Sequence, residues 1–267
     1  MKRENFYKSL RRRDNGLFGT SLSQSQVYGV EAILDECIAQ GCDLGQTAYI
    51  LATAYGETGG KMQPVRENMN YSAKRITQVF SAKRRQGIPP AQLANNPKLL
   101  ANTVYGGEWG EKNLGNRPGT NDGWDFRGFW IGQITGRRNA QKWADRLGVD
   151  IINNPETIDR LDLAVRGLVK PMMEGWATGR SLPGYVKGGK RDYVGARAVW
   201  NGSFAAREIA GHAEAFEAAL YAAGWSDAPD GYPPVRPDVE PTQTAPAKPH
   251  WLSSLINALL GMFKKSQ

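Results

Sequence analysis

Apolar residues recur at three- and four-residue spacing through most of this chain, and this period constrains the fold more than any other feature of the sequence. Ser23 and Ser25 offer N-cap oxygens, Gly41 ends the first such segment, and its predicted inward face comprises Val27, Val30, Ile33, Leu34, Cys37 and Ile38. The same period predicts helices over 161–176 and 208–223. Long alternations of apolar and polar residues are scarce, so we expect an all-α fold with few or no strands.

The segment Thr47–Tyr55 is apolar on almost every side, which predicts a central buried helix. Directly after it stands Glu57, within Gly-Glu-Thr-Gly-Gly. A carboxyl there would be partly desolvated and would face the negative end of the helix dipole, and both effects favour the protonated form that a general acid needs. Spacing alone is equally consistent with a solvent-exposed glutamate at a helix C-terminus.

A second carboxylate follows at Glu67, in a polar stretch beside Arg66. Hydrolysis of a glycosidic bond normally needs two carboxyl groups, and the neighbouring arginine predicts that Glu67 stays ionised. Asp122 and Asp125 are the rivals for this second role. They lie in a long glycine-rich stretch, 105–132, which we expect to be a functional loop.

Amide and hydroxyl side chains cluster just after that loop. Gln133 and Thr135 are two apart in a predicted extended piece, so they would share one face. Thr135 is predicted to cap a helix that ends at Gly148, with Asn139 in its first turn. Such groups suit the hydroxyl and N-acetyl groups of sugars, although capping and turn formation would also account for Thr135 and Asn139.

The net charge of +8 favours anionic partners: nucleic acid, an anionic membrane or wall, or none beyond a solvated basic face. No zinc-finger spacing or P-loop is present, so we expect no nucleic acid partner. Cys37 and Cys42 form no metal-binding pattern, and Cys37 is interpreted as a small core residue. We therefore expect no metal and no organic cofactor.

The composition changes after Trp225. Residues 227–250 are proline-rich and predict an extended linker, and residues 251–267 carry an apolar helical stripe followed by two lysines. This C-terminal segment would contact an anionic envelope or membrane, or alternatively pack back on the domain or self-associate. The N-terminus lacks the apolar core of a signal peptide, so the chain is expected to be made in the cytoplasm.

Several stretches together resemble the chitinase-like lysozymes of glycoside hydrolase family 19, in its phage endolysin branch. AYGETGG at 54–60 and ENMNYSA at 67–73 are similar to the catalytic stretch of that family. NTVYGG at 102–107 and GWDFRGFWIGQITGRRN at 123–139 resemble its central loop and substrate strand, and Trp200-Asn201-Gly202 resembles a later signature. The resemblance runs in order from about residue 20 to 224.

This resemblance implies a two-lobed, lysozyme-like catalytic domain over 1–226 with a central cleft. It assigns Glu57 as the general acid and Glu67 as the carboxylate that positions or activates water. It also predicts substrate contacts for six residues: Asn68, Tyr71, Gln133, Thr135, Asn139 and Asn201. The chain departs from the family pattern at Gly56, where histidine is usual, at Glu108, where arginine is usual, and at Gly202-Ser203.

The expected activity is therefore that of a lysozyme, which hydrolyses β-1,4 bonds in bacterial peptidoglycan with inversion. Inversion predicts carboxyl groups roughly 6.5–9.5 Å apart. Alternatives are a chitinase, a lytic transglycosylase, and a non-catalytic cationic protein that binds the wall or membrane. The protein would act on the cell wall after its release from the host cytoplasm.

Overall fold

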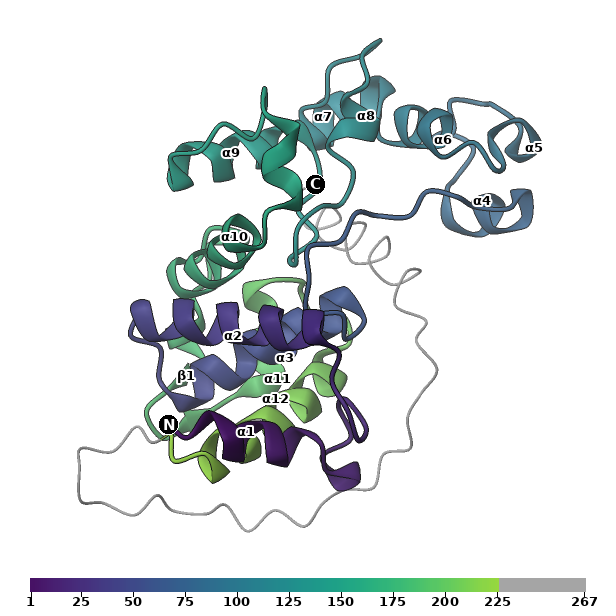
Figure 1. Ribbon diagram of the computed structural model, residues 1–267. Helices are drawn as coiled ribbons and strands as arrows, with labels where there is room; N and C mark the ends of the chain where they lie inside the picture. The colour runs from purple at the N-terminus through teal and green to yellow at the C-terminus, as the bar shows by residue number, and fades with distance from the viewer. Residues whose placement is uncertain (226–267) are drawn as a thin grey trace. The chain divides into compact units, whose positions relative to one another are not determined.

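The computed structural model describes residues 1–225, except the side chains of Pro155 and Glu156. The predicted linker (227–250) and C-terminal helix (251–267) lie outside the described residues. Within the described part, no helix has the length and apolar character needed to cross a membrane. The predicted predominantly helical fold is confirmed (Figure 1).

Twelve α-helices and two short strands are present in the described residues. The helices are α1 (Arg3–Leu10), α2 (Gln24–Ala39), α3 (Leu44–Thr58), α4 (Ala73–Val79), α5 (Pro90–Leu93), α6 (Pro97–Val104), α7 (Gly107–Leu114), α8 (Asp122–Asp125), α9 (Arg137–Leu147), α10 (Leu161–Glu174), α11 (Tyr193–Ala196) and α12 (Ala206–Ala222). Single 3₁₀ turns are η1 (Arg13–Asn15), η2 (Pro155–Asp159), η3 (Leu182–Gly184) and η4 (Arg197–Val199). Strands β1 (Val186–Lys187) and β2 (Lys190–Arg191) pair antiparallel, with Val186 opposite Arg191 and Lys187 opposite Lys190.

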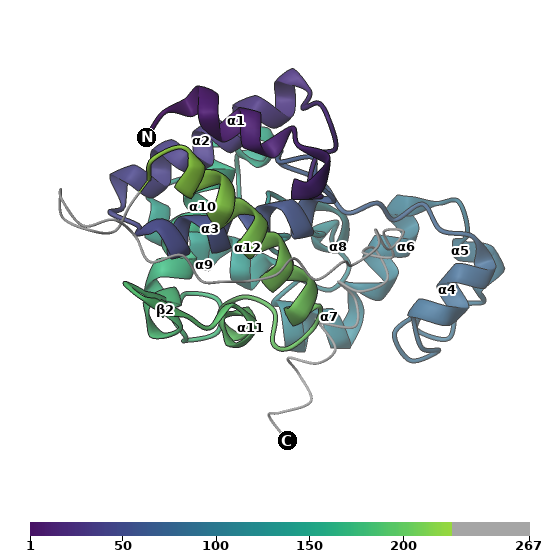
Figure 2. The same cartoon turned by 90° about the horizontal axis from the view of Figure 1, so that it is seen from below.

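The chain divides into two compact units. One comprises Met1–Met62 and the described residues from Leu168 onward, and the other comprises Gln63–Gly167. In the first unit α3 is the central helix: α2 and α12 both pack against it, and α1 and α11 pack on α12 (Figures 1 and 2). Asp43 and Gln46 form a capping box at the start of α3.

The burial of α3 confirms the sequence prediction of a central helix. Its middle residues Ala48, Tyr49, Ile50, Leu51 and Ala52 expose no surface. Each large apolar side chain buried in this way contributes about 1.5–3 kcal/mol to folding. A helix buried on all sides brings its last turn into the core as well, which determines the environment of Glu57.

The first predicted helix is confirmed as α2, with a capping box between Ser23 and Gln26. The prediction that Ile38 belongs to the inward face of α2 was wrong, because its side chain is 56% exposed. It follows Cys37 by one position and is therefore rotated about 100° from the buried face. Spacing over a whole helix cannot resolve where that face ends.

The second unit contains α4 to α9 and the first residues of α10. The predicted loop at 105–132 is not one continuous loop, because it contains α7 and α8. Helices α7 and α8 each pack on α6, and α9 packs on α7. Gly167 of α10 lies against Trp130, where an added Cβ would come within 2.6 Å of the indole ring.

Candidate active site

Glu57 lies inside the last turn of α3, not after the helix as the sequence suggested. Helix α3 ends at Gly59, whose φ of +59° is the left-handed conformation that glycine adopts at helix C-termini. Glu57 is 4% exposed, so the alternative of a solvent-exposed glutamate is wrong. At Gly56 the neighbouring helix α12 comes so close that an added Cβ would overlap Ile209. A larger residue at position 56 would therefore require the end of the Ile209 side chain to move.

A buried arginine is the direct partner of Glu57. Arg197 Nη2 donates to Glu57 Oε1 at 2.7 Å, and both side chains are 3% exposed. Arg197 Nε donates to the carbonyl of Phe204 at 2.9 Å, which fixes the guanidinium. Arg197 Nη1 is also buried and has no hydrogen-bond partner among the described residues. The arrangement is a desolvated charge pair with a spare donor beside the candidate acid.

Sequence reasoning missed Arg197. The pair joins residues far apart in the chain, and no spacing rule links them. The available signal was a single arginine within an otherwise apolar stretch, between Ala196 and Val199, both fully buried. A charge at such a position needs a buried partner.

Asn201 follows in the same stretch. Its backbone N–H donates to the carbonyl of Arg197 at 2.9 Å, and its side chain is 7% exposed. The structure thus brings two residues together at the end of α3, namely Glu57 and Arg197, with Asn201 anchored to the arginine's own backbone. The contact of Asn201 with substrate stays a prediction.

Glu67 lies in the second unit, where two donors bind its carboxylate. Tyr105 donates its hydroxyl to Oε1 at 2.7 Å, and the backbone N–H of Gly128 donates to Oε2 at 3.2 Å. Burial raises the pKa of Glu67 above its ordinary value, although these hydrogen bonds and the charges of Arg127 and Arg84 oppose the shift. Burial of Glu67 therefore opposes the ionised form that the sequence led us to expect, and that expectation stays a prediction.

The reason is that Arg66, its neighbour in sequence, does not pair with Glu67. The Arg66 guanidinium donates instead to the carbonyl of Asp125 at 2.7 Å. The cationic support comes first from Arg127, whose Nε donates to the carbonyl of Glu67 at 3.1 Å, and then from Arg84, which is buried and donates to the carbonyl of Val104. Adjacency in sequence did not predict which charges act on this carboxyl.

Gly128 is required beside Glu67 for steric reasons. A Cβ there would lie 2.6 Å from Gln133 Oε1 and 3.2 Å from Glu67 Cβ. The backbone of Glu67 also donates to the carbonyl of Gly128 at 2.7 Å. The structure therefore brings Glu67 and Gln133 together at this glycine.

The predicted extended conformation at Gln133 was wrong. Gln133 has φ of +54° and lies in a turn between Phe129 and Ile134, which form an isolated antiparallel bridge. Its Nε2 donates to the carbonyls of Val65 and Trp130, both at 3.0 Å. These bonds hold the turn against the segment that carries Glu67.

The predicted cap of the following helix was also wrong. Gly136 is the N-cap of α9 and Thr135 makes no capping bond, because its hydroxyl donates to the carbonyl of Gln133. Asn139 does lie in the first turn, and its Nδ2 donates to the carbonyl of Thr135 at 2.9 Å. The predicted sugar contacts of these residues stay predictions.

The other two candidates follow Glu67 in sequence. Asn68 is exposed, and its Oδ1 accepts the N–H of Asn70 in a local turn. Tyr71 is buried and stacks on Phe80, and burial together with the charge of Glu67 raises the pKa of Tyr71 to about 12. Tyr71 therefore lies close enough to Glu67 to feel its charge, whereas Asn68 is exposed to solvent.

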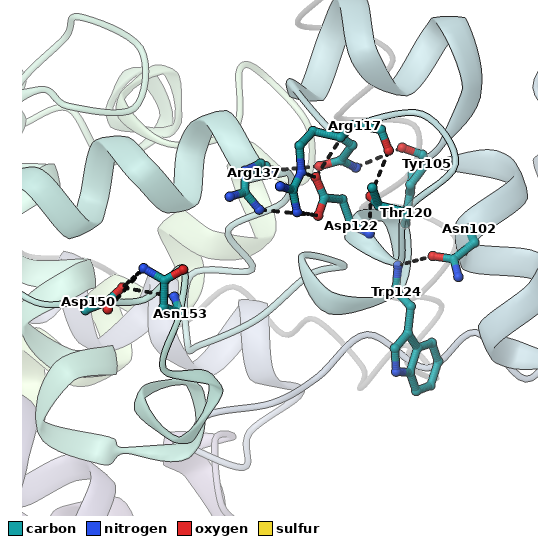
Figure 3. Close-up of polar contacts among 10 residues, drawn as sticks. Asn102, Tyr105, Arg117, Thr120, Asp122, Trp124, Arg137, Asp150 and Asn153 are labelled. Atoms are coloured by element: carbon teal, nitrogen blue, oxygen red, sulfur yellow. Dashed lines mark hydrogen bonds and ion pairs between the residues drawn. The ribbon is translucent and has the colours of Figure 1, made fainter.

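Asp122 anchors a loop. Its carboxylate accepts from the Arg117 backbone at 2.9 Å and from the Arg117 and Arg137 guanidiniums at 3.0 and 3.3 Å (Figure 3). Burial by itself would raise the pKa of Asp122, but the hydrogen bonds from Arg117 and the charge of Arg137 outweigh it and lower the pKa. Because the Asp122 carboxylate already accepts hydrogen bonds from two arginines, it is a weaker candidate than Glu67 for the second catalytic group. Its rival Asp125 is exposed.

Among the described residues, no group of three or more histidine, cysteine, aspartate or glutamate side chains is arranged to hold a metal ion. The polar groups that the structure does assemble are carboxylates with their donors, in one case an arginine and in the other a tyrosine and a backbone amide. Such groups suit acid/base chemistry.

Comparison with known proteins decides the family. No family model matches the chain. A protein of Haemophilus influenzae named "Glycosyl hydrolase family 19 domain-containing protein" is 34% identical over 146 residues, which are 54% of this chain and 70% of that protein. The chain belongs to glycosyl hydrolase family 19. The family resemblance inferred from the motifs is thereby confirmed, and the coarse activity is that of a glycoside hydrolase.

Proposed function

We propose that this family 19 protein is a lysozyme that hydrolyses the β-1,4 bonds of bacterial peptidoglycan with inversion, acting as an endolysin. Glu57 is the general acid and Glu67 is the second carboxylate, which positions or activates water. The observation that carries the proposal is the buried carboxyl of Glu57, held by Arg197 at the end of α3. A charge pair of this kind is costly to bury and contributes little net stability, so a catalytic use is a physical reason to keep it.

The division of labour, with Glu57 as the acid and Glu67 as the second carboxylate, rests on the resemblance to family 19, and the structure adds that the two groups have different surroundings. Glu57 Oε1 is bound by a guanidinium, while Glu67 is bound by neutral donors, a phenol and a backbone amide. Two carboxyl groups in different environments can serve as acid and base in one reaction. The sugar contacts proposed for Asn68, Tyr71, Gln133, Thr135, Asn139 and Asn201 complete the assignment.

The test is lysis of peptidoglycan by variants that keep the shape of each side chain. Glu57→Gln and Glu67→Gln should each abolish the fall in turbidity of a wall suspension. The matched controls Glu214→Gln and Glu111→Gln change exposed glutamates of the same two units and should lyse like the wild type. Lysis by Glu57→Gln at the wild-type rate would refute the enzymatic proposal and favour membrane or wall disruption by charge.

Mass spectrometry of the released fragments separates the enzymatic alternatives. A reducing end that carries one added water supports hydrolysis, whereas an anhydro sugar supports a lytic transglycosylase. Chitinase activity is the second candidate, favoured by the family itself, and comparison of rates on chitin and on peptidoglycan decides between the two substrates.

Envelope contact through residues 251–267 is tested by deletion of Trp251–Gln267, since intact lysis of whole cells without that segment would exclude it.

A further inference from the structure

Three buried polar atoms along the helix that carries Glu57 have no hydrogen-bond partner among the described residues. They are the hydroxyl oxygens of Tyr49 and Thr53 in α3 and Nη1 of Arg197 in η4. Tyr49 and Thr53 expose no surface, and Arg197 is almost as deeply buried. A buried donor without a partner is costly, so each of these groups calls for one.

The three atoms lie between a stacked pair and an ion pair of the first unit. Tyr49 stacks on Tyr193 with ring centroids 5.8 Å apart, and Arg197, four residues after Tyr193, binds Glu57. Tyr49 and Glu57 are about 12 Å apart along α3. Thr53 stands midway, four residues from each and therefore on the same side of the helix. We call the space between the two pairs the α3–η4 interval.

The charges of the ion pair act on the Tyr49 hydroxyl. Burial raises the pKa of Tyr49, the positive charge of Arg197 opposes this rise, and the negative charge of Glu57 adds to it. The hydroxyl of Tyr49 is therefore close enough to both groups to share a polar neighbour with them.

The Thr53 hydroxyl does not bond to its own helix. Thr58, also in α3, donates to the carbonyl of Ala54 at 2.7 Å, which is a common bond of a threonine inside a helix. Thr53 makes no such bond, so its hydroxyl can serve the α3–η4 interval. Because the atoms that line this interval are buried, the partner they share has to be as small as water.

We propose that ordered water lies in the α3–η4 interval and bridges Arg197 Nη1 to the hydroxyls of Thr53 and Tyr49, so that these two residues position Glu57 through its arginine. Buried water typically binds two to four polar groups, and this interval offers three. Arg197 already uses Nη2 for Glu57 and Nε for the carbonyl of Phe204. Water on Nη1 would fix the remaining nitrogen of the guanidinium. The positioning role rests on the proposed function, whereas the water does not.

A high-resolution crystal structure of the full chain tests the water directly. Ordered water should lie within about 3.2 Å of Arg197 Nη1 and of at least one of the two hydroxyls. It should be lost in the double variant Thr53→Val/Tyr49→Phe. A structure in which Arg197 Nη1 donates directly to a protein group would overturn the proposal, and so would water that keeps its place in the double variant.

Kinetics on soluble peptidoglycan strands test the positioning role. Thr53→Val keeps the shape of the side chain and removes the hydroxyl, and we expect kcat to fall about fivefold with KM unchanged, because Glu57 acts on the transition state. Thr53→Ser restores the hydroxyl and should restore kcat to within about twofold of wild type. The matched control Thr47→Val removes a fully buried hydroxyl of the same helix, beside the Cys37 thiol, and should leave kcat unchanged.

A purely structural role predicts a different pattern. Equal losses of kcat in Thr53→Val and Thr47→Val would assign the effect to packing and overturn the positioning role, as would a Thr53→Ser variant as slow as Thr53→Val. Should Thr53→Val fail to fold, Tyr49→Phe removes a single oxygen and gives the same comparison. Its control is Tyr7→Phe, at another buried tyrosine of the first unit.

Failure of this inference is distinguishable from failure of the proposed function. Wild-type kcat in both Thr53→Val and Tyr49→Phe, with Glu57→Gln inactive, would refute the positioning role and leave the lysozyme intact. Lysis by Glu57→Gln at the wild-type rate would refute the lysozyme, and the crystal structures would still decide whether water bridges Arg197 to α3.

Discussion

Removal of Arg197 is the perturbation whose consequence follows most directly from the structure. At 2.7 Å the charges of Arg197 and Glu57 attract by about 6 kcal/mol at an effective dielectric constant of about 20. Most of this attraction offsets the cost of taking both groups out of water, so the intact pair contributes little net stability. Removing one partner leaves the other buried and uncompensated, at a cost of about 3–5 kcal/mol.

We therefore expect Arg197→Met to lower the free energy of unfolding by about 4 kcal/mol, a large part of the usual 5–15 kcal/mol. Glu57→Gln keeps an oxygen acceptor for the guanidinium and should cost about 1–2 kcal/mol. The double variant should be more stable than the sum of the two single costs predicts, by at least about 1 kcal/mol.

Urea unfolding of the four proteins measures this coupling. Arg197 also donates to the carbonyl of Phe204, and the loss of that bond occurs in both Arg197 variants, so it cancels in the cycle. Additive effects within about 0.5 kcal/mol would refute the buried pair as an energetic unit. A cost of Arg197→Met below about 1 kcal/mol would refute it as well.

Three further results are expected in the second unit. Asp122→Asn should cost about 2 kcal/mol at pH 7, less than breaking a fully buried pair, because Arg117 is 59% exposed. Since the pKa of Asp122 is lowered, its ionised form stabilises the fold above its ordinary value of 3.8, and thermal unfolding should show this contribution disappearing as the pH falls below that value. Tyr105→Phe removes a hydrogen bond that lowers the pKa of Glu67, so the acid limb of the profile of kcat/KM against pH should move to higher pH. An acid limb that does not move would contradict the role of Glu67 as the catalytic base. Because the pKa of Glu67 is raised, its protonated form stabilises the fold, and this contribution is lost as the pH rises through the folded pKa. Gln imitates the protonated form at every pH. The melting temperature of Glu67→Gln should therefore exceed that of wild type by more at pH 7 than at pH 4.

The sequence by itself determined the helices and the family. Period and caps are local properties, so Ser23 and the apolar run at 47–55 were sufficient to place α2 and α3. The motif around Glu57 and the stretch at 123–139 indicated family 19 before any geometry was known. Errors arose where a short segment is shaped by its neighbours, as at Gln133, whose turn is held by the carbonyl of Val65.

Only the tertiary structure decided the partners of the two carboxyl groups. Arg197 reaches Glu57, and Tyr105 reaches Glu67, through folding of distant segments, and neither contact leaves a spacing signal in the chain. Arg66 is adjacent to Glu67 yet donates elsewhere, because the direction of a side chain depends on the packing of the whole unit. Electrostatic environment is a property of three-dimensional distance and burial, and the sequence records neither.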